Sequence, residues 1–333
     1  MINTYPLRVL ITGGREVGGM ASFAAALREG FVDLGVPAEI IAPSQILLHW
    51  QELRDPLVLK ILSTSAIFAA PLTRRAICVA HGFPCIDRGW PNMLGKLLSY
   101  RLTTASRGAQ LVQVSDYAAM HLRSIFGLRI NAVIHNPVCS LFLEDNAEEH
   151  VVRQAITYVG RLHQAKNVDL LLHAMRDVLD ENHGLNAWFV GDGPMRAGLE
   201  RAAAGDERIH FFGELPPLEV RDRLRRSRVF ISGCPHEALG IAYIEALSQG
   251  CAVAMPASGG GLEIAPELIG GRIQLFPISL PRQGIIAALR KALLAPSMPI
   301  SMEKYSARAI AAAYLSLPSS SSSPAICPGE AAR

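Results

Sequence analysis

The sequence lacks the features of several protein classes. Only 18% of its 333 residues are charged and half are hydrophobic, which excludes a disordered chain. The net charge of +3 is too small to predict nucleic acid as a partner. Six cysteines, at positions 78, 85, 139, 234, 251 and 327, form no Cys-x-x-Cys pair. Because a large apolar core makes disulfides unnecessary, we expect a reducing, cytoplasmic compartment.

Membrane and metal signals are missing as well. The start MINTYPLRVLITGG lacks the basic-then-apolar plan of a signal peptide, and Lys60 and Pro71 interrupt the apolar run from Pro56 to Leu72. No Asp-x-Asp pair occurs, and no His or Cys cluster has metal spacing. We therefore expect no metal and no cofactor, so that protein cations and helix N-termini would hold any phosphate.

Basic residues gather in one segment. Between residues 51 and 130 ten basic side chains stand against four acidic ones: Arg54, Lys60, Arg74, Arg75, Arg88, Lys96, Arg101, Arg107, Arg123 and Arg129 against Glu52, Asp55, Asp87 and Asp116. This excess indicates a face toward an anionic membrane surface. Ordinary solvated arginines on helices are the alternative.

Length and periodicity predict two α/β domains. Short β-branched runs alternate with helix-period segments, as in parallel sheets with helices on both faces. In the first half we expect strands at 8–12, 38–42, 76–80, 111–114 and 132–134, with a helix at 20–34. In the second half we expect strands at 155–159, 187–190, 209–212, 229–232, 252–255 and 272–276.

These strands predict two facing Rossmann-like, doubly wound domains with the ligand between them. The first spans residues 1–145, and the second spans 146–300. A linker is expected around 135–150. A closing helix at 302–317, within a segment 301–317, and a serine-rich, disordered tail at 318–333 would follow.

A glycine loop, GGREVGG at 13–19, follows the first expected strand. Gly18 and Gly19 would let backbone amides approach a phosphate closely. Gly13 and Gly18 have P-loop spacing, but Gly19 and Met20 stand where Lys and Ser or Thr belong, so an ATPase is excluded. A plain tight turn is the alternative.

GRLHQAKN at 160–167 places Arg161 and Lys166 in one strand-to-helix loop. Two cations beside a helix N-terminus suit two adjacent phosphates, although chance surface cations remain an alternative. FVGDGP at 189–194 lacks the third glycine of a dinucleotide fingerprint. We interpret Gly191 and Gly193 as a bend that accepts a base or ribose, with an ordinary turn as the alternative.

HEALGIAYIEALSQG at 236–250 carries two glutamates eight positions apart. Glu237 would lie in the loop before a helix that begins near Gly240, and Glu245 would lie inside that helix beside its apolar stripe. A buried carboxylate needs donors, which sugar hydroxyls would supply. An internal salt bridge for Glu245 and a helix N-terminal charge for Glu237 are the alternatives.

Among the histidines, His81 follows a first-domain strand and would face the ligand. A hydrogen-bonded structural histidine is an equal alternative there. We expect His236, next to Glu237, to be structural.

Taken together, these motifs resemble the retaining glycosyltransferases of family four, the group 1 glycosyl transferases, with the GT-B fold. Further matches are QVSDYAAMHLRSIFG, VIHNPV and PASGGGLE, and the resemblance covers roughly residues 8–277. It implies that Arg161 and Lys166 bind the donor diphosphate, Glu237 the sugar hydroxyls and Glu245 the ribose. It further places His81 at the anomeric centre, Gly18 and Gly19 at the phosphates, and the amides of Leu239, Gly240 and Ile241 at phosphate or sugar.

The resemblance implies metal-independent, retaining transfer from a nucleotide diphosphate sugar to a glycan or lipid-linked acceptor. It implies that the domain 1–145 carries the acceptor side and that the domain 146–300 binds the nucleotide sugar. Cell-surface polysaccharide or lipopolysaccharide synthesis is the expected setting, with the protein cytoplasmic and peripheral at the inner face of the membrane. Departures are Gly233 and Cys234 where the family has Pro-Ser, Ala252 for a proline, and a short first lobe. A nucleotide-sugar epimerase of the same fold and a non-catalytic nucleotide-sugar-binding subunit remain alternatives, and a dehydrogenase lacks its fingerprint.

Overall fold

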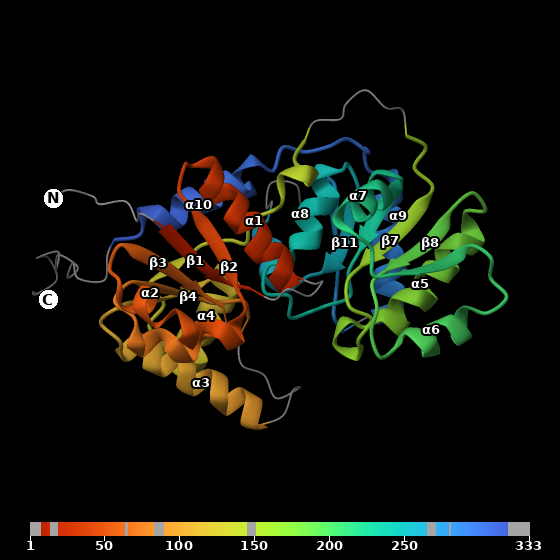
Figure 1. Ribbon diagram of the computed structural model, residues 1–333. Helices are drawn as coiled ribbons and strands as arrows, with labels where there is room; N and C mark the ends of the chain where they lie inside the picture. Colours follow the sequence, from red (N-terminus) through yellow and green to blue (C-terminus); the bar gives the residue numbers. More distant parts are fainter. Residues whose placement is uncertain are drawn as a thin grey trace, which may run out of the picture.

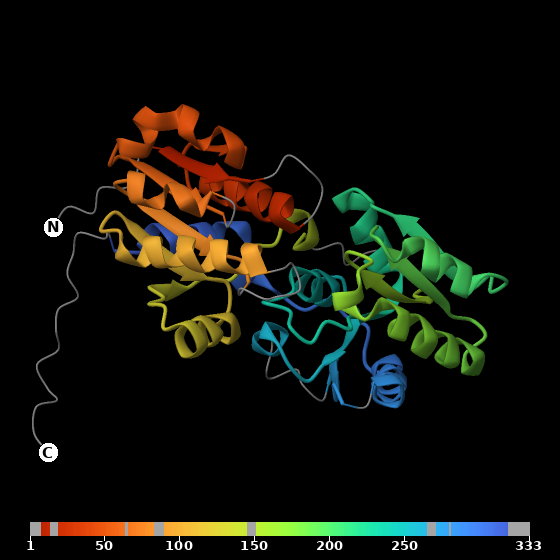
Figure 2. The ribbon, with the colours of Figure 1, turned by 90° about the horizontal axis from the view of Figure 1, so that it is seen from below.

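The computed structural model describes residues 8–13, 19–63, 66–82, 90–144, 151–264, 271–279 and 281–318. These residues form two lobes, each with a parallel six-stranded sheet between helices (Figure 1). The view from below shows the lobes side by side, with the end of the chain returning to the first lobe (Figure 2). The predicted α/β class with two Rossmann-like lobes is therefore confirmed.

The N-terminal sheet has the order β2 (Ala38–Ile41), β1 (Arg8–Thr12), β3 (Val58–Leu62), β4 (Ala76–Ala80), β5 (Ala109–Gln113) and β6 (Ala132–Val133). Its α-helices are α1 (Gly19–Asp33), α2 (Trp50–Arg54), α3 (Trp90–Ala105) and α4 (Asp116–Phe126). Short 3₁₀ turns, η1 (Pro43–His49) and η2 (Ile67–Leu72), flank β3. Strands β3, β4 and β5 are buried along their whole length, as expected for a sheet covered on both faces.

The C-terminal sheet has the order β12 (Ile273–Phe276), β11 (Ala252–Pro256), β10 (Ser227–Ile231), β7 (Ala155–Val159), β8 (Asn186–Val190) and β9 (Ile209–Gly213). Its α-helices are α5 (Val168–Glu181), α6 (Arg196–Ala203), α7 (Pro217–Arg225), α8 (Ile241–Ser248) and α9 (Pro281–Leu294). The 3₁₀ turns η4 (Ser140–Phe142), η5 (Gln164–Lys166), η6 (Gly260–Glu263) and η8 (Glu303–Tyr305) lie in its connections. The chain order reverses beside β7, the point where ligands bind in such sheets.

Strand β3 was missed by sequence reasoning, which treated 56–72 only as an interrupted apolar run. The interruption, Lys60, is fully buried in that strand. Its ammonium donates to the carbonyls of Asp55 and Val58, both at 2.8 Å. Desolvation lowers the pKa of Lys60 to about 8. A buried lysine satisfied by backbone carbonyls hides a strand from a search for apolar runs.

The expected closing helix is wrong in one detail, because 302–317 holds η8 and then α10 (Ala307–Ser316) instead of one helix. Ser306 separates them in an extended conformation, pairs as a bridge with Val138 and caps α10 by accepting from the amide of Ala309. Helix α10 then packs on α1 of the N-terminal lobe, where a side chain at Gly30 would lie 1.9 Å from the Ala307 carbonyl. From residue 319 the expected tail lies outside the described residues.

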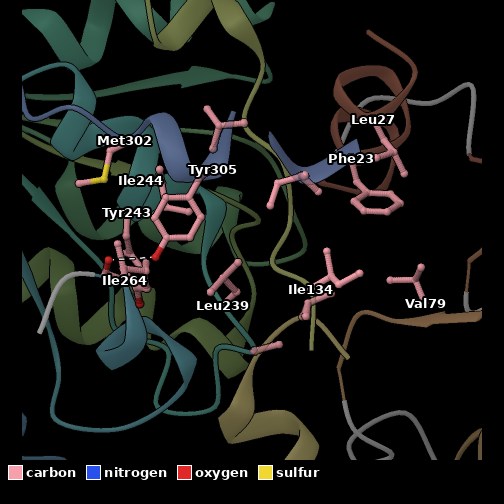
Figure 3. Packing of buried hydrophobic residues seen from close by; sticks show 14 of the residues in the cluster. Phe23, Leu27, Val79, Ile134, Leu239, Tyr243, Ile244, Ile264, Met302 and Tyr305 are labelled. Atoms are coloured by element: carbon pink, nitrogen blue, oxygen red, sulfur yellow. Dashed lines mark hydrogen bonds between the residues drawn. The ribbon is translucent and has the colours of Figure 1, made fainter. Parts of the chain in front are cut away.

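Both lobes share one hydrophobic core at their junction. Figure 3 shows Phe23 and Leu27 of α1 on one side and Tyr243, Ile244 and other C-terminal residues opposite. The Tyr305 hydroxyl donates to the carbonyl of Ile264 at 2.9 Å, which ties the returning segment to the end of η6 in the C-terminal lobe. The lobes are therefore joined by packing as well as by the linker.

Candidate active site

The loop after β7 carries the two predicted phosphate-binding cations and is held firmly by its neighbours. Asn167, at its end, has φ of +51°, a left-handed conformation that asparagine tolerates better than most residues. Its side-chain amide donates to the carbonyl of Gly233 at 2.8 Å. A Cβ at Gly233 would lie 2.7 Å from the Lys166 carbonyl. Gly233, a departure from the family pattern, thus allows this close approach of two loops.

Lys166 and Glu237, assigned to diphosphate and sugar, form one ion pair. The ammonium lies 2.6 Å from a Glu237 carboxylate oxygen and 3.5 Å from the Cys234 sulfur. Burial by itself lowers the pKa of Lys166, but the charge and hydrogen bond of Glu237 outweigh it, so the pKa is raised. Burial raises the pKa of the Cys234 thiol, against the charge of Lys166. Lys166 is therefore a fixed cation, and Cys234 its neutral neighbour.

Arg161 lies in the same loop with an exposed side chain. Its carbonyl accepts a hydrogen bond from the Tyr158 hydroxyl at 2.9 Å, which fixes the backbone. Its guanidinium has no ion pair or hydrogen bond with any described residue. The loop therefore presents an available cation next to the Lys166–Glu237 pair.

Helix α8 begins just after Glu237. Gly240 has φ of +84°, and a Cβ there would lie 2.4 Å from the Tyr243 ring, so glycine is required. Leu239 is buried, and Ile241 is the first helical residue. Within the described part of the chain, the N–H groups of residues 239–242 have no hydrogen-bond acceptor. Such open N–H groups at a helix start attract anions.

Glu245 lies one turn into α8 and is partly buried. Desolvation raises its pKa to about 7. The alternative of an internal salt bridge is not observed, since no cation among the described residues pairs with it. A desolvated carboxylate without a paired cation lowers the stability of the folded protein unless a ligand supplies hydrogen-bond donors.

His81 follows β4 and packs edge-on against Phe23, with ring centroids 4.3 Å apart. Burial lowers its pKa to about 4, against the nearby Asn136 side chain, which raises it. Its Nε2 is buried and makes no hydrogen bond of normal geometry to a described residue. The imidazole is thus neutral at pH 7. Because the Asn136 side chain interacts with the ring, a hydrogen-bonded structural histidine stays the alternative to a ligand contact.

The predicted glycines have different environments. Gly191 and Gly193 have φ of +126° and +158°, and Cβ atoms there would lie 2.0 and 2.4 Å from the carbonyls of Gly160 and Leu162. Both positions must be glycine because the two loops cross here. Contact of these two glycines with a base or ribose stays a prediction. Gly19 is exposed at the start of α1 with open space around it. Gly18 lies outside the described residues.

Sequence reasoning missed the contacts that join the lobes near this site. The Tyr117 hydroxyl of α4 lies 3.3 Å from Nδ1 of His236, a contact that agrees with a structural role for His236. Glu263 of η6 accepts from the backbone of α4. No local pattern marks either contact, because the partners stand more than a hundred positions apart.

Two kinds of feature are not found among the described residues. None of the helices combines the length and apolarity that a bilayer crossing needs. No group of three or more His, Cys, Asp or Glu side chains in these ranges is arranged to hold a metal ion. Independence of metal stays a prediction.

The C-terminal lobe is similar in sequence to known glycosyltransferases. Residues 153–292 match the family model described as Glycosyl transferases group 1. Over 112 residues the chain is 31% identical to sulfoquinovosyl transferase SQD2 of Arabidopsis thaliana, covering 34% of this chain and 21% of that protein. Over 96 residues it is 32% identical to the GDP-mannose-dependent alpha-(1-6)-phosphatidylinositol dimannoside mannosyltransferase of Mycobacterium tuberculosis, covering 28% and 25%. The match spans less than a third of either relative.

The whole chain resembles a solved structure of Anabaena HepE in complex with UDP and glucose. The TM-score is 0.63 at 14% identity, and the alignment covers 92% of this chain and 95% of that one. The two lobes therefore define a GT-B fold. Over residues 153–292 the C-terminal lobe is similar to the group 1 glycosyl transferases, and the predicted resemblance to that family is confirmed.

Proposed function

We propose that this protein is a retaining glycosyltransferase that moves a sugar from a nucleotide diphosphate to a glycan or lipid-linked acceptor of a cell-surface polysaccharide or lipopolysaccharide. The Lys166–Glu237 pair beside the open N-terminus of α8 carries this proposal. The UDP and glucose in the related HepE structure support the donor class. Epimerase and non-catalytic binding remain the outcomes to be excluded by product analysis.

Each residue has a definite task in this reaction. As the glycosidic bond breaks, negative charge grows on the leaving diphosphate, and preorganised donors stabilise it. Arg161, Lys166 and the first N–H groups of α8 would supply those donors without a metal. Glu237 would accept hydrogen bonds from sugar hydroxyls while its partner Lys166 contacts phosphate. The neutral His81 ring would bond a sugar hydroxyl near the anomeric carbon.

Removing one phosphate-binding cation tests the reaction. Arg161→Ala should lower kcat by about a hundredfold or more, because comparable donors supply roughly 3–4 kcal/mol to the transition state. Steady-state kinetics with the nucleotide sugar that most stabilises the protein against heat would measure it. Lys166→Ala should behave alike, although it leaves Glu237 without its ion-pair partner.

Arg161 gives the cleaner test, because no described residue depends on its guanidinium. Arg290→Ala on α9, which breaks only an exposed ion pair with Glu181, is the matched control. If both site variants fold by circular dichroism and turn over donor at the wild-type rate, the assignment is wrong.

We further propose that the acceptor is reached at an anionic membrane surface through α3. Trp90, Leu94 and Leu98 repeat every fourth residue on α3 and are 59%, 57% and 60% exposed. Helix α3 lies on the outer side of the N-terminal lobe (Figure 1). It starts at the carboxyl edge of its sheet, the edge where ligands bind, so Trp90 is its end nearest the site.

The chain from α3 to β6 also carries an excess of cations. Across the described residues 90–131, five cations face one acid: Lys96, Arg101, Arg107, Arg123 and Arg129 against Asp116. None of the five has an ion pair with a described residue, whereas Arg282 and Arg290 of α9 are paired with acids of α5. Unpaired cations near anionic lipid contribute about 1 kcal/mol each. The lipid named in the mycobacterial relative, phosphatidylinositol dimannoside, fits this acceptor class.

Vesicle sedimentation tests this surface. We expect the protein to pellet with vesicles of phosphatidylglycerol and phosphatidylcholine but not with phosphatidylcholine alone. Leu94→Glu combined with Leu98→Glu should abolish pelleting, whereas Leu294→Glu at the exposed end of α9 should not. Wild-type binding by the double variant would refute the assignment to α3.

A further inference from the structure

The N-terminus of α4 in the first lobe is capped by a carboxylate of the second lobe. One Glu263 oxygen accepts from the amide of Asp116 at 2.8 Å, and the other accepts from the amide of Tyr117 at 2.6 Å. The Ser115 hydroxyl, the N-cap of the same helix, accepts from Ala118 at 3.1 Å. A helix start favours an anion, so the bond between lobes also stabilises α4.

The environment of Glu263 keeps it charged. Burial by itself raises its pKa, but the nearby His135 ring and the two α4 amides outweigh burial, and the net pKa is lowered. The His135 ring lies 3.7 Å from the carboxylate and belongs to the segment leaving the first lobe. Asn136, the next residue, lies beside His81. Glu263 therefore holds two first-lobe elements, one of them next to a proposed site residue.

On its other side, Glu263 is joined to the loop that carries Glu237. The amide of Gly260, at the start of η6, donates to the Glu237 carbonyl at 2.8 Å. A Cβ at Gly260 would lie 1.7 Å from the Ala238 carbonyl and 2.9 Å from the Ser115 hydroxyl. The η6 turn therefore lies between the Glu237 loop of the second lobe and the N-terminus of α4 in the first lobe.

We infer that Glu263 is a positioning residue that sets the closed arrangement of the lobes and, through η6, places Glu237 against the first lobe. It does not touch the reacting atoms in this assignment. It acts by holding α4 and the Glu237 loop at one separation, as Tyr117 and His236 do more weakly. The inference rests on the proposed function only for its activity readout, because the separation of the lobes is measurable without any substrate.

The test compares Glu263→Gln and Glu263→Ala with wild type. Because hydrogen bonds to a charged group are strong, losing the carboxylate should shift the closed-to-open balance about tenfold or more. Small-angle scattering should show the largest radius of gyration for Glu263→Ala, a smaller one for Glu263→Gln and the smallest for wild type. Sugar transfer should fall through kcat, while UDP or GDP affinity by calorimetry stays within about twofold.

The controls separate this role from a local one. Glu214→Ala removes an exposed carboxylate of the second lobe that has no ion-pair partner among the described residues, and should change neither readout. Tyr117→Phe should open the lobes slightly without loss of the α4 cap. If folded Glu263→Ala has the radius of gyration and the kcat of wild type, the inference is wrong. Opened lobes in a protein whose wild type transfers no sugar would uphold it while refuting the proposed function.

Discussion

Glu245 combines an unfavourable environment with a proposed ligand contact. The pKa of Glu245 is about 7 instead of the ordinary 4.5, and desolvation alone causes this shift. The folded state therefore binds this proton more tightly than the unfolded state. The resulting destabilisation is absent below pH 4.5, grows as pH rises, and is complete above pH 7. A residue that weakens the free protein is expected where a ligand restores the balance.

Glu245→Gln tests this balance. Glutamine is neutral at all pH values, so the variant should be more stable than wild type by roughly 1–3 kcal/mol at pH 8 and equal to it near pH 4.5. Urea unfolding at both pH values measures the difference, and Glu214→Gln, on an exposed side chain, should show none. The same variant should bind nucleotide more weakly by about 1.5–3 kcal/mol if the ribose donates to the carboxylate. Unchanged affinity would leave Glu245 a structural residue.

At the scale of elements, two strand-end loops of the C-terminal sheet are built as one unit. The amide of Leu162 donates to the Asp192 carbonyl at 2.8 Å, and the amide of Met195 donates to the Leu162 carbonyl at 3.1 Å. Gly191 and Gly193 leave room for that crossing. The position of Arg161 therefore depends on glycines thirty residues away.

Gly191→Ala should destabilise the protein by roughly 2–4 kcal/mol, because a left-handed backbone and a carbonyl 2.0 Å from the new Cβ both oppose it. Chemical denaturation measures the loss. Gly198→Ala in α6, where a Cβ meets nothing within 4 Å, should instead gain about 0.5–1 kcal/mol. Equal effects of the two substitutions would show that the loops do not cross as described.

Across the whole molecule, the return of α10 to α1 decides how the lobes are joined. Ser306 pairs with Val138, and Arg308 donates to the Asp33 carbonyl at 3.0 Å. The contact of Gly30 with Ala307 is too close for any side chain. The last helix is thus part of the first lobe, although it follows the second in sequence.

Gly30→Ala should weaken the packing of α10 on α1. The added methyl overlaps the backbone of α10, at a cost of about 1–3 kcal/mol that helix propensity offsets only partly. Thermal unfolding should begin earlier, and proteolysis between 295 and 306 should become faster. Gly95→Ala in α3, with open space around its Cβ, serves as the control. Unchanged proteolysis would mean that α10 is held elsewhere.

Local patterns were sufficient for the class of fold, and they also named the candidate site residues. Strands such as 76–80 and 155–159 follow from short buried runs between turn signals, and these two predictions match to the residue. The cations and glutamates were found because strand ends and helix starts are where parallel sheets bind ligands. Strand β3 escaped because a buried lysine breaks the apolar pattern that marks a strand.

Tertiary packing decided the contacts between residues that lie far apart in the sequence. The ion pair of Lys166 with Glu237, the Glu263 cap on α4 and the crossing at Gly191 link residues that no window of sequence compares. Their geometry arises only when two sheets and a returning helix bury their apolar faces together. Spacing therefore names the candidate site residues, while tertiary contacts set their charge, their partners and their separation across the lobes.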